Sequence, residues 1–224
     1  MLSTGTKTET TKPDAVKSTQ KNVLSPGQLV ATNQFVCKTR GRLTNSMGKT
    51  EEKDMYCGGT IFCDIASKKI EVFPQVSLSA NETIRSKHEF ERESLYSGVQ
   101  VMDYVSDNGV YTSQEFMKEL QQEGQGLKLC GVGAHHQNGV AERAIRTVVE
   151  RARSMLLHAA CKWPGQVEAD LWLQAMQYAT YLWNNTPIQG VGLSPEEIFT
   201  RTKQPHAVLT NAKVWGCPCY VLDP

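Results

Sequence analysis

Two stretches decide the fold of this chain, Ser106-Asp107-Asn108-Gly109 and His136-Gln137-Asn138-Gly139-Val140-Ala141-Glu142-Arg143. The first places a carboxylate where a strand ends, and the second places one in the first turn of an amphipathic helix. The 34 residues between Asp107 and Glu142 leave room for one helix and one short strand. A strand–helix–strand–helix unit of this length can bring two acids together, and paired carboxylates can hold a divalent metal ion.

Upstream of this unit the sequence alternates as β-strands do. The alternation predicts a strand over 28–37, with Asn33 on the same face as its apolar neighbours Ala31 and Phe35. Two more strands, over 57–65 and 69–76, are close enough to form a hairpin. A helix is expected to follow from Ser79 to Gly98, and a fourth strand then runs from Val99 to Ser106. The element order β, β, β, α, β, α, β, α, α predicts an α/β fold with a mixed sheet covered by helices.

Capping residues and apolar periodicity place the later helices. Thr112 with Glu115 forms a capping box, and Asn138 can cap the helix that carries Glu142. At about 100° per residue that helix has a single apolar stripe, which consists of Ala141, Ile145, Val148, Val149, Ala152 and Leu156. Glu142, Arg146 and Arg153 fall along one edge of the stripe, an arrangement that suits a metal ion beside a phosphate backbone.

Length and composition describe one ordinary α/β domain with additional segments at its ends. The chain has 224 residues, of which 40% are hydrophobic and 21% charged. We expect a disordered lead-in over 1–25, the core over 26–200 and the start of a following, truncated segment over 201–224. The net charge of +1 gives no global attraction to nucleic acid, so DNA affinity must come from local basic clusters.

Two other features of the composition concern the environment of the chain. No apolar run approaches the ~18 residues that a membrane-spanning helix requires. The cysteines number seven and are scattered, a pattern that favours reduced thiols in the nucleus or cytoplasm over a disulfide framework.

Several motifs in combination carry a family resemblance. Asp107-Asn108-Gly109, then Ser113-Gln114-Glu115-Phe116, then the stretch from Gln137 to Arg143 closely resemble the integrase core of copia-type (Ty1/copia) retrotransposons, in the retroviral-type integrase superfamily. The segment from Val214 to Leu222 resembles the one that follows that core, so the similarity spans roughly 26–224. The resemblance implies a ribonuclease-H-like fold, with a mixed five-stranded sheet and helices on both faces.

The resemblance also implies a chemistry, because this family uses Asp, Asp and Glu to hold two Mg²⁺ ions for in-line attack on a phosphodiester. By resemblance, Asp107 is the second acid and Glu142 the third, and both are predicted metal ligands for Mg²⁺ or Mn²⁺. The first acid belongs at Asn33, a degenerate catalytic position whose neutral amide removes one negative charge and a bridging carboxylate. Neither Asp64 nor Asp103 is well placed to substitute for it. We therefore predict weakened metal binding and impaired DNA strand transfer.

The partners implied are DNA, as both element ends and target, and further copies of the chain in a homo-oligomer. Nucleic-acid contacts are predicted at Gln137, Asn138, Arg143, Arg146, Arg153, Lys38 and Arg40. The basic side chains among them are equally consistent with ordinary solvated surface. Two other functions remain open: a non-catalytic nucleic-acid-binding or assembly protein that retains the fold, and a nuclease acting on RNA·DNA hybrids. The integrase-type motif from Asn138 to Glu142 argues against the nuclease.

Overall fold

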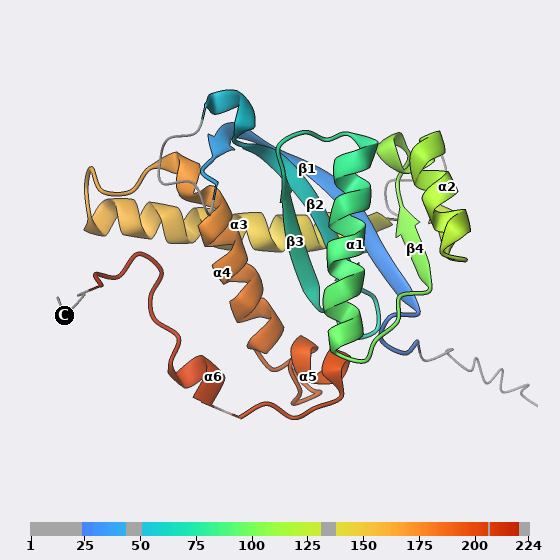
Figure 1. Ribbon diagram of the computed structural model, residues 1–224. Helices are drawn as coiled ribbons and strands as arrows, with labels where there is room; N and C mark the ends of the chain where they lie inside the picture. Colours follow the sequence, from blue (N-terminus) through green and yellow to red (C-terminus); the bar gives the residue numbers. More distant parts are fainter. Residues whose placement is uncertain (1–23, 44–50, 131–137, 206, 220–224) are drawn as a thin grey trace, which may run out of the picture.

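A single mixed sheet forms the centre of the computed structural model, which describes residues 24–43, 51–130, 138–205 and 207–219. Its strands are β1 (Leu29–Gly41), β2 (Tyr56–Asp64), β3 (Ile70–Gln75), β4 (Asp103–Ser106) and β5 (Gly126–Leu129). They lie in the order β3-β2-β1-β4-β5 (Figure 1). β1 pairs antiparallel with β2 and parallel with β4, while β2–β3 is antiparallel and β4–β5 parallel. The predicted mixed five-stranded sheet is therefore confirmed.

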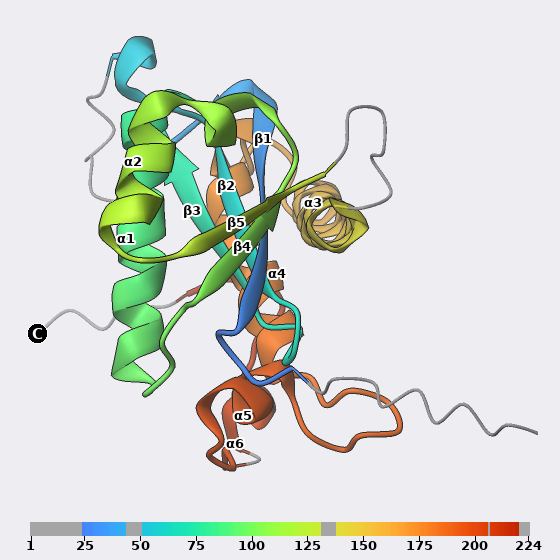
Figure 2. The ribbon, with the colours of Figure 1, turned by 90° about the vertical axis from the view of Figure 1, so that its right-hand side faces the viewer.

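Helices cover both faces of this sheet, as predicted. The first pair packs on one face and the second pair on the other, while two short helices follow at one end (Figure 2). The first pair is α1 (Ala80–Tyr96) and α2 (Gln114–Gln122), the second is α3 (Gly139–Lys162) and α4 (Trp172–Asn185), and the short helices are α5 (Pro195–Thr200) and α6 (Ala207–Thr210).

The alternation of strand side chains divides the core into two clusters. Val30 and Phe62 face α1 and α2, where the Phe62 ring stacks on Phe90 at a centroid distance of 4.7 Å. Ala31 and Phe35 face α3 and α4. Because side chains on a strand change face at every residue, Asn33 belongs to the α3/α4 side.

Two helix and strand starts differ from the sequence prediction. The cap of α2 is Ser113, whose hydroxyl accepts the N–H of Phe116, whereas Thr112 ends a 3-10 turn that spans Gly109–Thr112. β4 begins at Asp103 and not at residue 99, because the N–H of Val99 donates to the Ser94 carbonyl and so terminates α1.

The buried stripe of α3 is also rotated relative to the prediction. Val149 is 39% exposed, and Ala144, which is 5% exposed, takes its place in the core. Ala144 belongs to the core cluster that α3 forms with the sheet and with α4, and the packing of this cluster decides which flank of α3 is buried. Periodicity alone gave the width of the stripe but not the side on which a neighbouring helix would lie.

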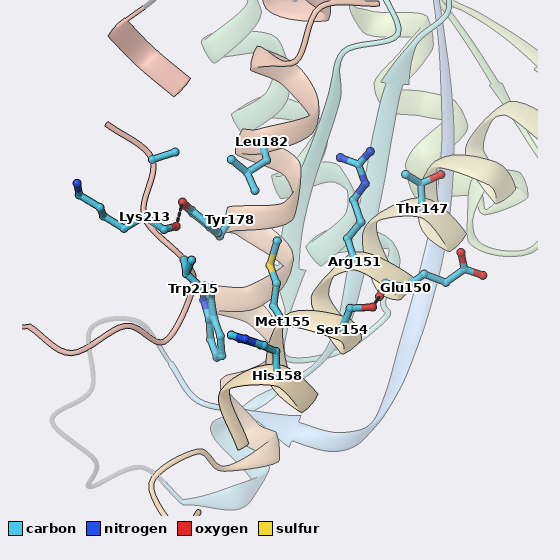
Figure 3. Close-up of a pocket in the computed structure, with 12 residues that line it drawn as sticks. Thr147, Glu150, Arg151, Ser154, Met155, His158, Tyr178, Leu182, Lys213 and Trp215 are labelled. Atoms are coloured by element: carbon cyan, nitrogen blue, oxygen red, sulfur yellow. Dashed lines mark hydrogen bonds between the residues drawn. The ribbon is translucent and has the colours of Figure 1, made fainter. Parts of the chain in front are cut away.

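The segment after α5 returns along α4 toward α3. The Tyr181 hydroxyl donates to the Val208 carbonyl at 3.1 Å, and the Tyr178 hydroxyl donates to the carbonyl of Lys213. This segment closes a groove of about 780 Å³ between α3 and α4, into which Met155 and Trp215 project (Figure 3).

Two observations concern membranes and thiols. Within the described ranges, no helix combines the length and the apolar character needed to cross a membrane. All seven cysteines lie in the described part of the chain, and none forms a disulfide there.

Candidate metal and nucleic-acid site

The candidate site lies where the parallel strands end beside the start of α3. The register pairs Leu29 with Asp103 and Ala31 with Val105, so the same offset places Asn33 beside Asp107, just beyond the end of β4. On the other side of β4, the N–H of Cys130 donates to the Ser106 carbonyl at 3.0 Å. These contacts place positions 33, 107 and 130 at one level along three neighbouring strands.

Thr32, next to Asn33, anchors both acid-bearing segments to β1. Its hydroxyl lies 3.1 Å from the hydroxyl of Tyr111, in the 3-10 turn that follows Asp107. Its carbonyl accepts the side-chain amide of Asn138, immediately before α3, at 3.1 Å. Thr32, Tyr111 and Asn138 are at most 1% exposed, so both bonds are shielded from water. A single strand residue therefore fixes the loop of Asp107 and the start of α3.

This arrangement corrects the capping prediction made for Asn138, because its side chain makes no capping hydrogen bond with α3. The side chain is 1% exposed, and its contact with a nucleic acid stays a prediction. An asparagine before a helix suits a cap and a cross-link equally well, and only the fold brings residues 32 and 138 together. Gln137, the other predicted contact in this motif, lies outside the described residues.

Asp107 and Glu142 both influence the thiol of Cys130 electrostatically. Asp107 is half-buried, Glu142 is exposed in the first turn of α3, and Cys130 is 6% exposed. Burial raises the pKa of the Cys130 thiol, and the negative charges of Asp107 and Glu142 raise this pKa further. The thiol therefore stays protonated at neutral pH. Sequence reasoning missed Cys130, which ends a short apolar run and has no motif around it.

Asn33 completes the candidate site without adding charge. It is half-buried, and its side-chain oxygen accepts the N–H of Gln34 at 2.8 Å. Among the described residues, no group of three or more His, Cys, Asp or Glu side chains is arranged to hold a metal ion. Asp107 and Glu142 supply hard oxygen donors of the kind that Mg²⁺ prefers. This donor set fits one divalent cation, whereas two cations would lack a bridging carboxylate.

The fold is shared with retroviral integrase cores. A chain of a simian T-cell lymphotropic virus intasome, solved in complex with PP2A regulatory subunit B56 gamma, matches with a TM-score of 0.60 at 13% identity, over 90% of this chain and 62% of that one. The HTLV-2 integrase catalytic core in complex with magnesium matches at 0.54 and 17% identity, over 79% and 98% of the two chains. The BIV core matches at 0.52 and 16% identity, over 78% and 95%. The predicted ribonuclease-H-like fold is thus confirmed.

A curated relative adds the sequence relationship, although no protein-family model matches the chain. The retrovirus-related Pol polyprotein from transposon TNT 1-94 of Nicotiana tabacum is 32% identical over 169 residues, which make up 73% of this chain. The chain is an integrase-like retrotransposon domain. It covers only 12% of the length of that polyprotein.

Asp64, another acid considered for the site, lies elsewhere in the integrase-like domain. Asp64 is fully buried and accepts three hydrogen bonds, from the N–H of Gly27 at 2.8 Å and from the N–H and hydroxyl of Ser67, each at 2.7 Å. It pairs with Val30, three positions along β1 from Asn33, which corresponds to ~10 Å. The prediction that Asp64 does not replace the first acid is consistent with this placement.

The predicted basic contacts of the domain lie on its surface. Arg143, Arg146 and Arg153 are exposed on α3, and within the described chain no ion pair involves them. Lys38 is exposed and Arg40 half-buried, both on the distal part of β1. Arg42 differs, because its guanidinium pairs with Glu168 at 2.6 Å and with Asp170 at 2.9 Å. Guanidinium groups without an internal partner are the ones suited to bind phosphate.

Proposed function

We propose that this chain is the catalytic-core fragment of a copia-type retrotransposon integrase in which metal-dependent DNA strand transfer is impaired. The observation that carries the proposal is the alignment of position 33 with Asp107 at the end of the parallel strands, beside the start of α3. This helix carries Glu142 in its first turn and is tied to β1 by the hydrogen bond from Asn138 to Thr32. Support comes from the transposon Pol relative and from the magnesium complex of the structurally similar HTLV-2 core.

Each polar residue of the site has a role in this proposal. Asp107 and Glu142 hold a divalent cation, Mg²⁺ or Mn²⁺, through their carboxylate oxygens. Such a cation supplies Lewis-acid activation of an attacking oxygen and stabilises the leaving one. Arg146 and Arg153, on the same edge of α3 as Glu142, contact phosphates of the bound DNA.

The impairment follows from charge and from a hydrogen bond already in place. A pair of divalent cations brings four positive charges, against which Asp107 and Glu142 offer only two negative ones. Asn33 adds none, and its amide oxygen already accepts the N–H of Gln34. An aspartate at this position would keep one oxygen for that N–H and direct the other, with its charge, at the cation.

The organisation and partners belong to the same proposal. Residues 26–200 form the catalytic core, and residues from 201 onward begin the segment that follows it in the family. Element ends and target DNA are the proposed substrates, and several copies of the domain act together in an intracellular, reducing compartment.

The test compares the unaltered chain with Asn33→Asp in a strand-transfer assay on element-end DNA, with Mg²⁺ and with Mn²⁺. We expect weak or no product from the unaltered chain and at least a tenfold gain (~1.4 kcal/mol) in the variant. The double variant Asn33→Asp/Glu142→Gln controls for contaminating nucleases and should be inactive. Robust transfer by the unaltered chain would refute the impairment.

A non-catalytic nucleic-acid-binding role is the second candidate, favoured by the exposed arginines of α3 beside an incomplete acid set. This role requires DNA binding that weakens steeply with salt and survives Glu142→Gln. The variant Arg146→Gln/Arg153→Gln should reduce both the affinity and its salt dependence. No measurable DNA binding at low salt would eliminate this candidate.

A further inference from the structure

A cavity lined by charged side chains lies at the free edge of β3, three strands across the sheet from β4, which Asp107 follows. It has a volume of about 660 Å³ and is bordered by β3, α1, α4 and α5. β3 is the outermost strand of the sheet, between α1 and α4 (Figure 1). We call this space the β3-edge cavity; its lining includes Lys69, Glu71, Val72, Glu93, Thr180 and Glu196.

The charge of the β3-edge cavity is strongly negative. Its ionisable lining consists of Lys69 and four glutamates, the three named above and Glu89. Lys69 lies 2.9 Å from Glu196, 3.5 Å from Glu71 and 4.6 Å from the ring centre of Phe199. Four carboxylates against one ammonium leave a net charge of −3 when all of these groups are ionised.

Burial makes these carboxylates costly to ionise. The pKa of Glu71 is raised to about 7, first by burial, against the lowering effect of Lys69, and then by Glu93 and Glu196. Burial also raises the pKa of Glu93. A cation placed between them would relieve both effects.

Thr180 provides an independent sign of a missing ligand. It is 4% exposed on α4, lines the cavity, and its buried hydroxyl has no hydrogen-bond partner among the described residues. A buried hydroxyl without a partner costs roughly 1–3 kcal/mol. One turn further along α4, the side chain of Asn184 binds the backbone of β3. Its amide group accepts the N–H of Ile70 at 2.9 Å and donates to the Ile70 carbonyl at 2.7 Å.

The strand edge continues into the cavity beyond Ile70. Backbone groups on a strand alternate in direction, so the N–H and carbonyl of Val72 point to the same outer edge as those of Ile70. Pro74, which has no N–H, follows at a position that edge strands tolerate. An extended segment has backbone groups that match this edge.

We propose that the β3-edge cavity binds an arginine side chain carried by an extended basic segment of a partner protein that lies along β3. The guanidinium donates to Glu71 and Glu93 and to the hydroxyl oxygen of Thr180, and the backbone of the segment pairs with Val72. A bare metal ion fits less well, because the described residues contain no set of three or more metal-ligating side chains. The planar fork of arginine matches carboxylates better than the ammonium of lysine does.

The test titrates the full chain with a short blocked peptide, Thr-Val-Arg-Val-Thr, and with the same peptide carrying citrulline in place of arginine. Binding is measured by calorimetry and mapped by backbone NMR shifts. We expect the arginine peptide to bind with shifts at Val72 and Thr180, and the neutral citrulline peptide to bind at least about tenfold more weakly. Equal binding of the two peptides, or shifts elsewhere, overturns the proposal.

Variants separate the cavity from general charge effects. Glu71→Gln and Glu93→Gln should each weaken the arginine peptide about tenfold, whereas Glu123→Gln, the same change at an exposed end of α2, should not. Thr180→Val keeps the shape and the fold, and should weaken the peptide several-fold without loss of thermal stability. Unchanged affinity in Thr180→Val and Glu71→Gln, or self-association that excludes the peptide from Val72, contradicts the assignment.

Discussion

Two acidic positions at opposite ends of the parallel part of the sheet differ in what surrounds them. Asp64, beside the start of β1, is fully buried, and three hydrogen bonds from Gly27 and Ser67 occupy its oxygens. Asp107 and Glu142, at the other end, are half-buried and exposed. The carboxylate of Asp64 stabilises a turn through these hydrogen bonds. Asp107 and Glu142 are more exposed, and their charges raise the pKa of the Cys130 thiol. Asp64 thus serves the fold, whereas we propose that Asp107 and Glu142 serve a ligand.

The largest expected effect is on the free energy of unfolding, measured for matched variants of Asp64 and Asp107. Asp64→Asn replaces an acceptor with an amide that cannot accept all three donors, so it should lower the free energy of unfolding by about 3 kcal/mol. Asp107→Asn should lower it by less than about 1 kcal/mol. Urea unfolding of the two variants gives both values. Equal losses would mean that Asp107 is as structural as Asp64.

The Thr32 anchor gives an intermediate effect. Asn138→Ala leaves the buried Thr32 carbonyl without its partner and should cost roughly 1–3 kcal/mol of stability. Asn108→Ala, at an exposed asparagine whose side chain makes no capping bond, is the matched control and should change little. Thermal unfolding of both variants measures the difference, and similar midpoints would contradict the anchoring role.

The titration of Glu71 should change the pH dependence of stability, by a smaller amount than the substitutions above change stability. Its pKa rises from 4.5 to about 7 on folding, so between these values the folded state holds a proton that the unfolded state has released. The contribution of Glu71 to stability is therefore present below about pH 4.5 and is lost as the pH rises to about 7. Glu71→Gln should flatten the stability curve in this window relative to Glu123→Gln. Parallel curves for the two variants would show that Glu71 titrates normally.

The sequence predicted the elements that depend on local patterns. Alternation along β1 and the hairpin to β3 gave the mixed sheet, and the motif that contains Glu142 gave the start of α3. These features need only the period of apolar side chains and short capping signals.

The sequence did not predict contacts that join distant segments. The bond from Asn138 to Thr32 spans 106 positions, and the alignment of positions 33, 107 and 130 depends on the register of three strands. The buried side of α3 was misplaced at Val149 because the position of α4 is a tertiary property. Asp107 and Glu142 were predictable because a local motif carries each of them. The contacts that position them join residues far apart in the sequence and were not predictable.

Metal binding measures whether Asn33 leaves this acid site short of one negative charge. Calorimetry with Mn²⁺ and Mg²⁺ compares the unaltered chain, Asn33→Asp, and Asn33→Asp/Glu142→Gln as the control. We expect weak binding of at most one ion by the unaltered chain, and at least about tenfold tighter binding by Asn33→Asp that the control loses. Equal affinity and stoichiometry in the unaltered chain and Asn33→Asp would contradict this expectation.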